Sequence, residues 1–120
     1  MDLSLADRRA IRETVERQLQ AFQNDDAVTA FAFASPKIQE QFGSPENFME
    51  MVATAYEPVY RPRSVVFEDP SIIRSTPAQP VFLLSGDGIP VTALYLMERQ
   101  SDGSWRINGC FLIPVNSTTS

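Results

Sequence analysis

The stretch V-T-A-L-Y-L-M-E-R-Q-S-D-G-S-W-R-I-N-G-C-F-L-I-P-V, residues 91–115, decides the fold. Two runs rich in apolar residues flank the sequence Ser101-Asp102-Gly103-Ser104, which is typical of a tight turn. We therefore expect two antiparallel strands joined as a β-hairpin, with the rest of the chain packed around them.

The loop length of this hairpin determines which residues face each other across it. A three-residue loop with Gly103 in the left-handed conformation pairs Glu98 with Arg106. It also pairs Arg99 with Trp105, whereas a two-residue loop would place polar residues opposite apolar ones. The sequence thus favours the three-residue loop. Continued along both strands, this register pairs Met97 with Ile107, Tyr95 with Gly109 and Ala93 with Phe111.

Both faces of the predicted hairpin are apolar near its centre, because side chains alternate between the faces of a strand. One face carries Val91, Ala93, Tyr95, Met97, Trp105, Ile107, Phe111 and Ile113. The other carries Leu94, Leu96, Cys110 and Leu112, with Glu98 and Arg106 nearer the turn. Such a sheet needs helices over one face and another cover over the second. We therefore predict a homodimer through the face formed by Leu94, Leu96, Cys110 and Leu112.

Length and composition limit the class of protein. The chain has 120 residues, which fits one domain, expected at residues 1–115 with a flexible tail at 116–120. A net charge of −5 argues against nucleic acid or an anionic membrane as the main partner. The single cysteine, Cys110, excludes an internal disulfide, and the N-terminus lacks the apolar run of a secretory signal. We therefore expect a cytoplasmic protein.

The absence of histidine from the chain removes whole classes of chemistry. Serine and cysteine nucleophiles activated by histidine are excluded, and so are the usual zinc ligand sets. No glycine-rich phosphate loop follows a strand, so no nucleotide fingerprint is present. We expect neither a metal nor a cofactor.

Helical signals fill the first half of the chain. Ser4 caps a helix that carries apolar residues at helical spacing and fades at Asn24. Asp25 or Asp26 can cap a second, apolar helix that ends at Ser35-Pro36. Pro36 can also open a short helix, 36–42, closed by Gly43. Ser44 then starts a third amphipathic helix, whose apolar residues are Phe48, Met51, Val52, Ala55 and Tyr56.

Strand signals fill the second half. The two prolines of 57–63 predict extended backbone that leads into a first strand at 64–68, resumed at 71–74. Residues 77–80 are expected to be irregular, and residues 81–85 to form a strand before the hairpin. This order predicts an α+β fold: three N-terminal helices on a strongly bent antiparallel sheet of about four strands, a cone with an apolar mouth.

Several segments carry a family resemblance. They are D-D-A-V-T-A-F-A-F-A-S-P at 25–36, Q-F-G-S-P-E-N-F at 41–48, P-V-Y-R-P-R-S-V at 58–65, L-Y-L-M-E-R-Q at 94–100 and D-G-S-W-R-I-N-G-C at 102–110. On these segments the chain resembles domain-of-unknown-function family 4864. Its order of elements resembles the cystatin-like, cone-shaped superfamily of nuclear transport factor two, ketosteroid isomerase and the SnoaL-like cyclases. The resemblance implies the fold and no particular activity, since that superfamily holds enzymes and binding modules alike.

An isomerase or lyase is one hypothesis for function. It requires a carboxylate base in an apolar pocket and a tyrosine that donates to a developing oxyanion. Tyr95, with Tyr56 or Tyr60, could supply the donor, and Asp69 or Glu68 the base. The alternative is that Tyr95 packs in the core while both carboxylates are solvated, which would defeat the hypothesis.

A binding module is the interpretation that we prefer. Arg61 and Arg63 flank Pro62 and could bind an anion as a fork, although pairing with surface acids such as Glu46, Glu50 or Glu57 is the simpler reading. We predict a non-catalytic cone that binds a small apolar or acidic ligand, or a protein partner. The residues expected at the ligand are Tyr60, Arg61, Arg63, Tyr95 and Trp105. A third hypothesis is an accessory subunit whose partner covers the open sheet face.

Overall fold

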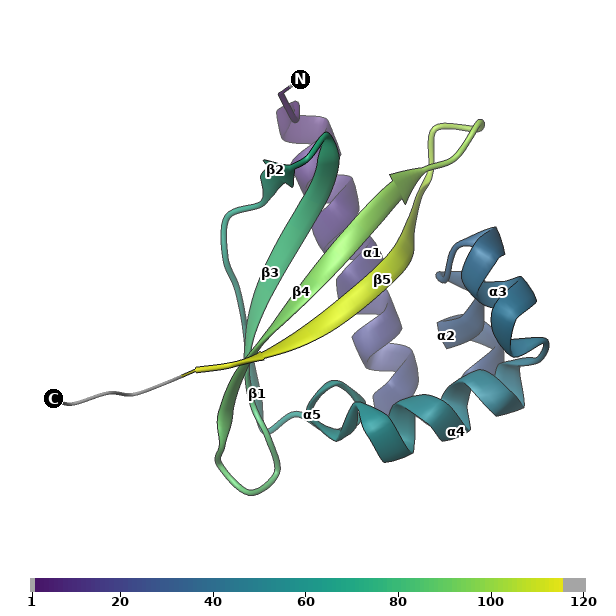
Figure 1. Ribbon diagram of the computed structural model, residues 1–120, viewed down its shortest axis with the longest axis vertical. Helices are drawn as coiled ribbons and strands as arrows, with labels where there is room; N and C mark the ends of the chain where they lie inside the picture. The colour runs from purple at the N-terminus through teal and green to yellow at the C-terminus, as the bar shows by residue number, and fades with distance from the viewer. Residues whose placement is uncertain (1, 116–120) are drawn as a thin grey trace, which may run out of the picture.

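The computed structural model describes residues 2–115, which form helices followed by an antiparallel sheet (Figure 1). The helices are α1 (Leu5–Gln23), α2 (Ala27–Ala32), α3 (Pro36–Phe42), α4 (Pro45–Ala55) and α5 (Glu57–Tyr60). The strands are β1 (Ser64–Phe67), β2 (Ser71–Ile73), β3 (Thr76–Leu84), β4 (Pro90–Arg99) and β5 (Trp105–Pro114). The predicted α+β class is confirmed. The tail predicted at 116–120 lies outside the described residues.

Short polar caps start the helices where the sequence predicts. Ser4 and Asp7 form a reciprocal capping box at the start of α1. Asp26, Ser35 and Ser44 accept backbone N–H groups at the starts of α2, α3 and α4. Each cap satisfies a donor that has no partner inside its own helix, so the helix boundaries follow from local chemistry.

The prediction of extended backbone throughout 57–63 is wrong for its first four residues, which form the single turn α5. Pro58 lies in the first turn of this helix, where its missing N–H would have no helical partner in any case. Pro62 follows directly after the C-cap residue Arg61 and prevents continuation. α5 is therefore too short to show a helical periodicity in the sequence.

The sheet has the order β1-β3-β4-β5, and β2 pairs with the same edge of β3 as β1 does. The prediction that residues 77–80 are irregular is wrong, because they belong to β3. The Pro80 carbonyl accepts from the Glu68 N–H, so the ring nitrogen of Pro80 faces the edge where β1 has just ended. A proline is tolerated there because little of the ladder depends on its missing donor.

The turn of the β4–β5 hairpin has the predicted form. Gly103 lies in the left-handed region at φ +88°, and the Gln100 N–H donates to the Ser104 carbonyl across a three-residue loop. Arg99 pairs with Trp105, and the pairs Glu98–Arg106 and Met97–Ile107 follow as predicted.

Beyond Ile107 the predicted register is wrong, because Asn108 is an extra residue in β5. This bulge makes Leu96 face Gly109 and Tyr95 face Cys110, one residue away from the prediction. The pairs that follow are Leu94–Phe111 and Ala93–Leu112. Cys110 and Leu112 therefore turn toward the helices, and Phe111 and Ile113 turn away from them.

The helices cover one face of the sheet, with α1 across it and α2, α3 and α4 beyond the β5 edge (Figure 1). The core on this inner face includes Ile11, Val15, Phe22, Phe48, Val81, Leu83, Ala93, Tyr95, Met97, Trp105 and Ile107. Trp105 is buried as predicted, whereas Phe111, predicted to share its face, is 57% exposed on the outer face. Within residues 2–115, no helix has the length and apolar character needed to cross a bilayer.

Candidate functional site

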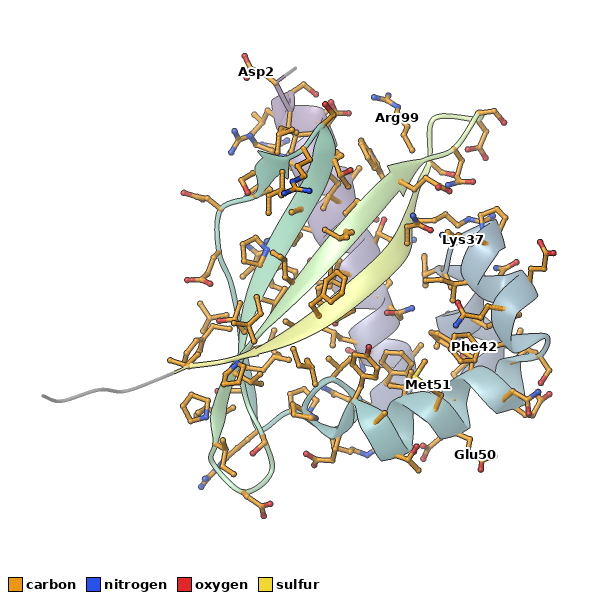
Figure 2. The ribbon with its side chains drawn as sticks, viewed as in Figure 1. Asp2, Lys37, Phe42, Glu50, Met51 and Arg99 are labelled. Atoms are coloured by element: carbon orange, nitrogen blue, oxygen red, sulfur yellow. The ribbon has the colours of Figure 1, made fainter. Side chains whose placement is uncertain are left out.

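A cavity of about 310 Å³ lies between edge strand β5 and helices α3 and α4. This volume is at the lower end of the range of roughly 300–1,000 Å³ that is typical of small-molecule sites. Figure 2 shows Lys37, Phe42 and Met51 on the helices along this side of the molecule. The apolar lining includes Phe22, Ile38, Phe42, Phe48, Met51, Val52, Val59, Ile107 and Phe111, and the polar lining includes Gln18, Lys37, Gln41, Tyr56, Asn108 and Cys110.

An aromatic cluster centred on Phe48 of α4 builds the helical wall of this pocket. The Phe48 ring lies 6.1 Å from Phe22 of α1, 5.6 Å from Phe31 of α2 and 5.8 Å from Phe42 of α3, measured between centroids. Tilted and edge-on aromatic contacts at such distances are favourable. One side chain thus ties the first four helices together beneath the pocket.

The bulge in β5 positions the opposite wall. Backbone hydrogen bonds of 2.8 Å join Ile107 to Phe33 and to Ser35, and so hold this part of the edge strand against the α2–α3 connection. The next residue, Asn108, is the extra residue of the bulge and lines the pocket. The Ser35 hydroxyl donates to its Oδ1 at 2.7 Å. Bulges commonly redirect a side chain in this way.

Cys110 and two tyrosines lie together beside the pocket. The Tyr56 hydroxyl donates to the Cys110 carbonyl at 3.2 Å. Desolvation raises the pKa of the Cys110 thiol to about 12, so the group is protonated at neutral pH and is a poor nucleophile. Burial also raises the pKa of Tyr56, and raises that of Tyr95 well above its usual value. Among residues 2–115, the buried Tyr95 hydroxyl has no hydrogen-bond partner.

Arg61 and Arg63, the two arms of the possible arginine fork, have different surroundings. The Arg61 guanidinium binds Asp25 with an N–O distance of 2.8 Å and lies over the Tyr60 ring, 4.1 Å from its centroid. The Tyr60 hydroxyl also donates to Asp25, and these contacts from Tyr60 and then Arg61 lower the pKa of that carboxyl. Arg63 is exposed and lies beside Gly88. Arg61 therefore fastens α5 to the α1–α2 connection, and the acid that it binds is none of the three expected.

Asp69 and Glu68 are exposed in the connection between β1 and β2, and neither lines the pocket. Trp105 lies at the other end of the sheet, beside a second cavity of about 400 Å³, with Arg99 stacked 5.5 Å from its ring. Of the residues predicted for catalysis or binding, the structure brings together Tyr56 and Tyr95, which both lie beside Cys110, and Tyr60 and Arg61, which both bind Asp25.

Sequence reasoning missed two polar residues of the pocket lining, Lys37 and Asn108. The available signals were weak. Lys37 is the single lysine of the chain, and Asn108-Gly109 is an unusual pair inside an otherwise apolar strand. Neither signal indicates a pocket until the bulge and α3 are placed side by side.

These features define a small α+β domain with a pocket between its helices and one edge of its sheet. Residues 4–120 match the model of the family described as Domain of unknown function (DUF4864), and the chain belongs to that family. No curated protein and no solved structure was found to match the chain.

Proposed function

We propose that the protein is a non-catalytic binding module that holds a small apolar molecule in the pocket between β5 and helices α3 and α4. The observation that carries this proposal is the lining itself: a mostly apolar cavity with a few polar groups in its walls. Such a composition is typical of sites that bind small molecules by burial of apolar surface.

The position of the carboxylates favours binding over catalysis. Among the described residues that line the pocket, none is an aspartate or a glutamate. An isomerase or lyase of the predicted kind needs a base there, and Asp69 and Glu68 lie elsewhere on the surface. The Cys110 thiol, with its pKa raised to about 12, is no substitute nucleophile at neutral pH.

A pair of tryptophan variants on α4 tests pocket binding. Met51 lines the pocket, so Met51→Trp should fill it and abolish binding of small aromatic probes. Glu50 is exposed on the same helix, so Glu50→Trp should leave binding unchanged. Native mass spectrometry detects co-purified molecules, and NMR titration with a fragment set then measures probe binding by each variant. Equal binding by the two variants, or no shifts among the lining residues of the unmodified protein, would refute the proposal.

We also propose a homodimer through the outer face of the sheet. Because of the bulge, Phe111 and Ile113 replace Cys110 and Leu112 among the residues of this interface. The rows Val66–Phe82–Thr92–Ile113 and Pro80–Leu94–Phe111 cross this face without a charged residue. Val66 is 56% exposed and Ile113 is 44% exposed. An uncharged apolar face can meet its own copy about a two-fold axis without burying charge.

Analytical ultracentrifugation with two lysine variants tests the dimer. Phe111→Lys should yield a folded monomer, because it places a charge within the proposed interface. Val28→Lys is the control, since Val28 is 67% exposed on α2 and lies away from that face. A monomeric unmodified protein at tens of micromolar would contradict the proposal.

The order of helices before an antiparallel sheet supports placement among the nuclear transport factor two-like cones. Comparison of an experimental structure of this protein with members of that superfamily tests the placement. The single cysteine supports a cytoplasmic location. Fractionation of source cells tests that location, and recovery outside the cytoplasm would refute it.

A further inference from the structure

We propose that the pocket is selective for small apolar carboxylic acids, whose carboxylate is held at the pocket mouth by Lys37 and Asn108. The inference rests on the proposed binding function and names the chemical class of the ligand.

The charge of the lining supports an anionic ligand. Among the described lining residues, Lys37 is the only one with a formal charge at neutral pH. The chain as a whole carries a net charge of −5. The pocket is therefore a locally cationic place on an acidic protein, where an anion meets no repelling carboxylate on the walls.

Hydrogen bonding fixes the orientation of the Asn108 amide. The Ser35 hydroxyl oxygen accepts from the Ile38 N–H at 3.3 Å and donates its hydrogen to Asn108 Oδ1 at 2.7 Å. The amide nitrogen of Asn108 therefore points away from Ser35, and within residues 2–115 its N–H groups donate to no acceptor. Lys37 and Asn108 both line the pocket, and Lys37 lies two residues after Ser35, whose hydroxyl binds the Asn108 amide. The lining therefore offers an ammonium group and an amide donor to one anion.

Two other polar groups of the lining already have partners. The Tyr56 hydroxyl donates to the Cys110 carbonyl, and the Gln18 amide donates to the Ala30 carbonyl at 3.0 Å. Apart from Gln41 and Cys110, the side chains of the remaining wall are aromatic or aliphatic. A carboxylate deep inside would lose its hydration without replacement, whereas at the mouth it would accept charge-assisted hydrogen bonds. The ligand should thus insert its apolar body first.

A matched pair of probes, phenylbutanoate and phenylbutanol, tests the selectivity, because the two share an apolar body and differ in the charged group. For the unmodified protein, we expect the acid to bind about tenfold more tightly than the alcohol in NMR titrations. Lys37→Met should bring the two affinities to within about twofold, and Lys37→Arg should keep most of the preference. Arg9→Met, a change at an exposed cation on α1, should leave the preference unchanged.

Chemical labelling gives a second readout, because Lys37 is the single lysine. Phenylbutanoate should slow acylation of Lys37 several-fold, and phenylbutanol should not. Equal affinity for acid and alcohol in the unmodified protein, or an acid preference that survives Lys37→Met, would overturn the selectivity while leaving the pocket proposal intact. Failure of both probes to shift lining resonances would instead refute the proposed function.

Discussion

The strand pairing in the two halves of the β4–β5 hairpin has different causes. Between Met97 and Ile107, around the turn, the pairing follows from the loop chemistry and from opposite charges and apolar residues across the strands. Beyond Asn108, the pairing is displaced by one residue, and there the run Cys110-Phe111-Leu112-Ile113 is continuously apolar, so its pattern does not decide which side chains face the core. A turn is specified by its own residues, whereas a bulge is specified by what packs against the strand.

The tertiary cause of the displacement is visible at the β5 edge. On the edge of β5 that faces away from β4, the Ile107 backbone is hydrogen-bonded to Phe33 and Ser35. Ser35 also binds the Asn108 side chain. These contacts belong to the α2–α3 connection, more than seventy residues earlier in the chain. They exchange the faces of Cys110 and Phe111, so that Cys110 turns toward the helices and Phe111 is exposed on the outer face.

Thiol chemistry offers the largest test of this difference between the two halves. In the unbulged register Cys110 would lie on the outer face, but the structure places it inward with its pKa raised to about 12. Because only the thiolate reacts, labelling at pH 8 should be about a thousandfold slower in the native protein than in urea, where the thiol pKa is roughly 8.5. The native rate should keep rising with pH toward 12, whereas the rate in urea should level off above about 9.

A second thiol on the same strand is the control for that experiment. Ile113 lies on the outer face, within the proposed dimer interface, so a Cys110→Ala, Ile113→Cys variant that is diluted until it is monomeric should react rapidly without denaturant. Native labelling of Cys110 at a rate similar to that of the relocated cysteine would show that the bulge is absent in solution.

The sequence was sufficient to predict the features with local determinants. The helix starts at Ser4, Asp26, Ser35 and Ser44 follow from capping side chains, and the Gly103 loop follows from turn chemistry. The features that were mispredicted depend on partners distant in the chain. The clearest case is Pro80, which lies within β3 because the partner strand on its side ends nearby.

The candidate site was less predictable than the fold. The sequence suggests Tyr56 as a catalytic donor, whereas in the structure Tyr56 lines the pocket and its hydroxyl donates to a backbone carbonyl. Lys37 and Asn108 are ordinary polar residues in the sequence. They acquire a common location only because the bulge turns β5 toward the start of α3.

Two glycine-to-alanine variants compare the hairpin halves by stability. Gly103 has φ +88°, so Gly103→Ala should cost about 1–2 kcal/mol of unfolding free energy through backbone strain alone, since an added Cβ meets nothing within 4 Å. Gly109 is not in the left-handed region, and its Cβ would make an ordinary contact of 3.7 Å with Leu96. Gly109→Ala should therefore change stability by less than about 0.5 kcal/mol. Urea titrations measure both, and a larger cost at Gly109 would reverse the comparison.

A double-mutant cycle on Ser35 and Asn108 measures the contact that joins the bulge to the helices. Ser35→Ala alone should cost about 1–2 kcal/mol, because it removes both the α3 cap and the hydrogen bond to Asn108. Asn108→Ala removes only the second interaction, so the coupling energy between the two changes should be about 1 kcal/mol. Urea denaturation of the four proteins provides the values. A coupling near zero would mean that the bulge is held by the Ile107 backbone alone, and the Asn108 amide would then lose the restraint that aims its N–H groups at the pocket.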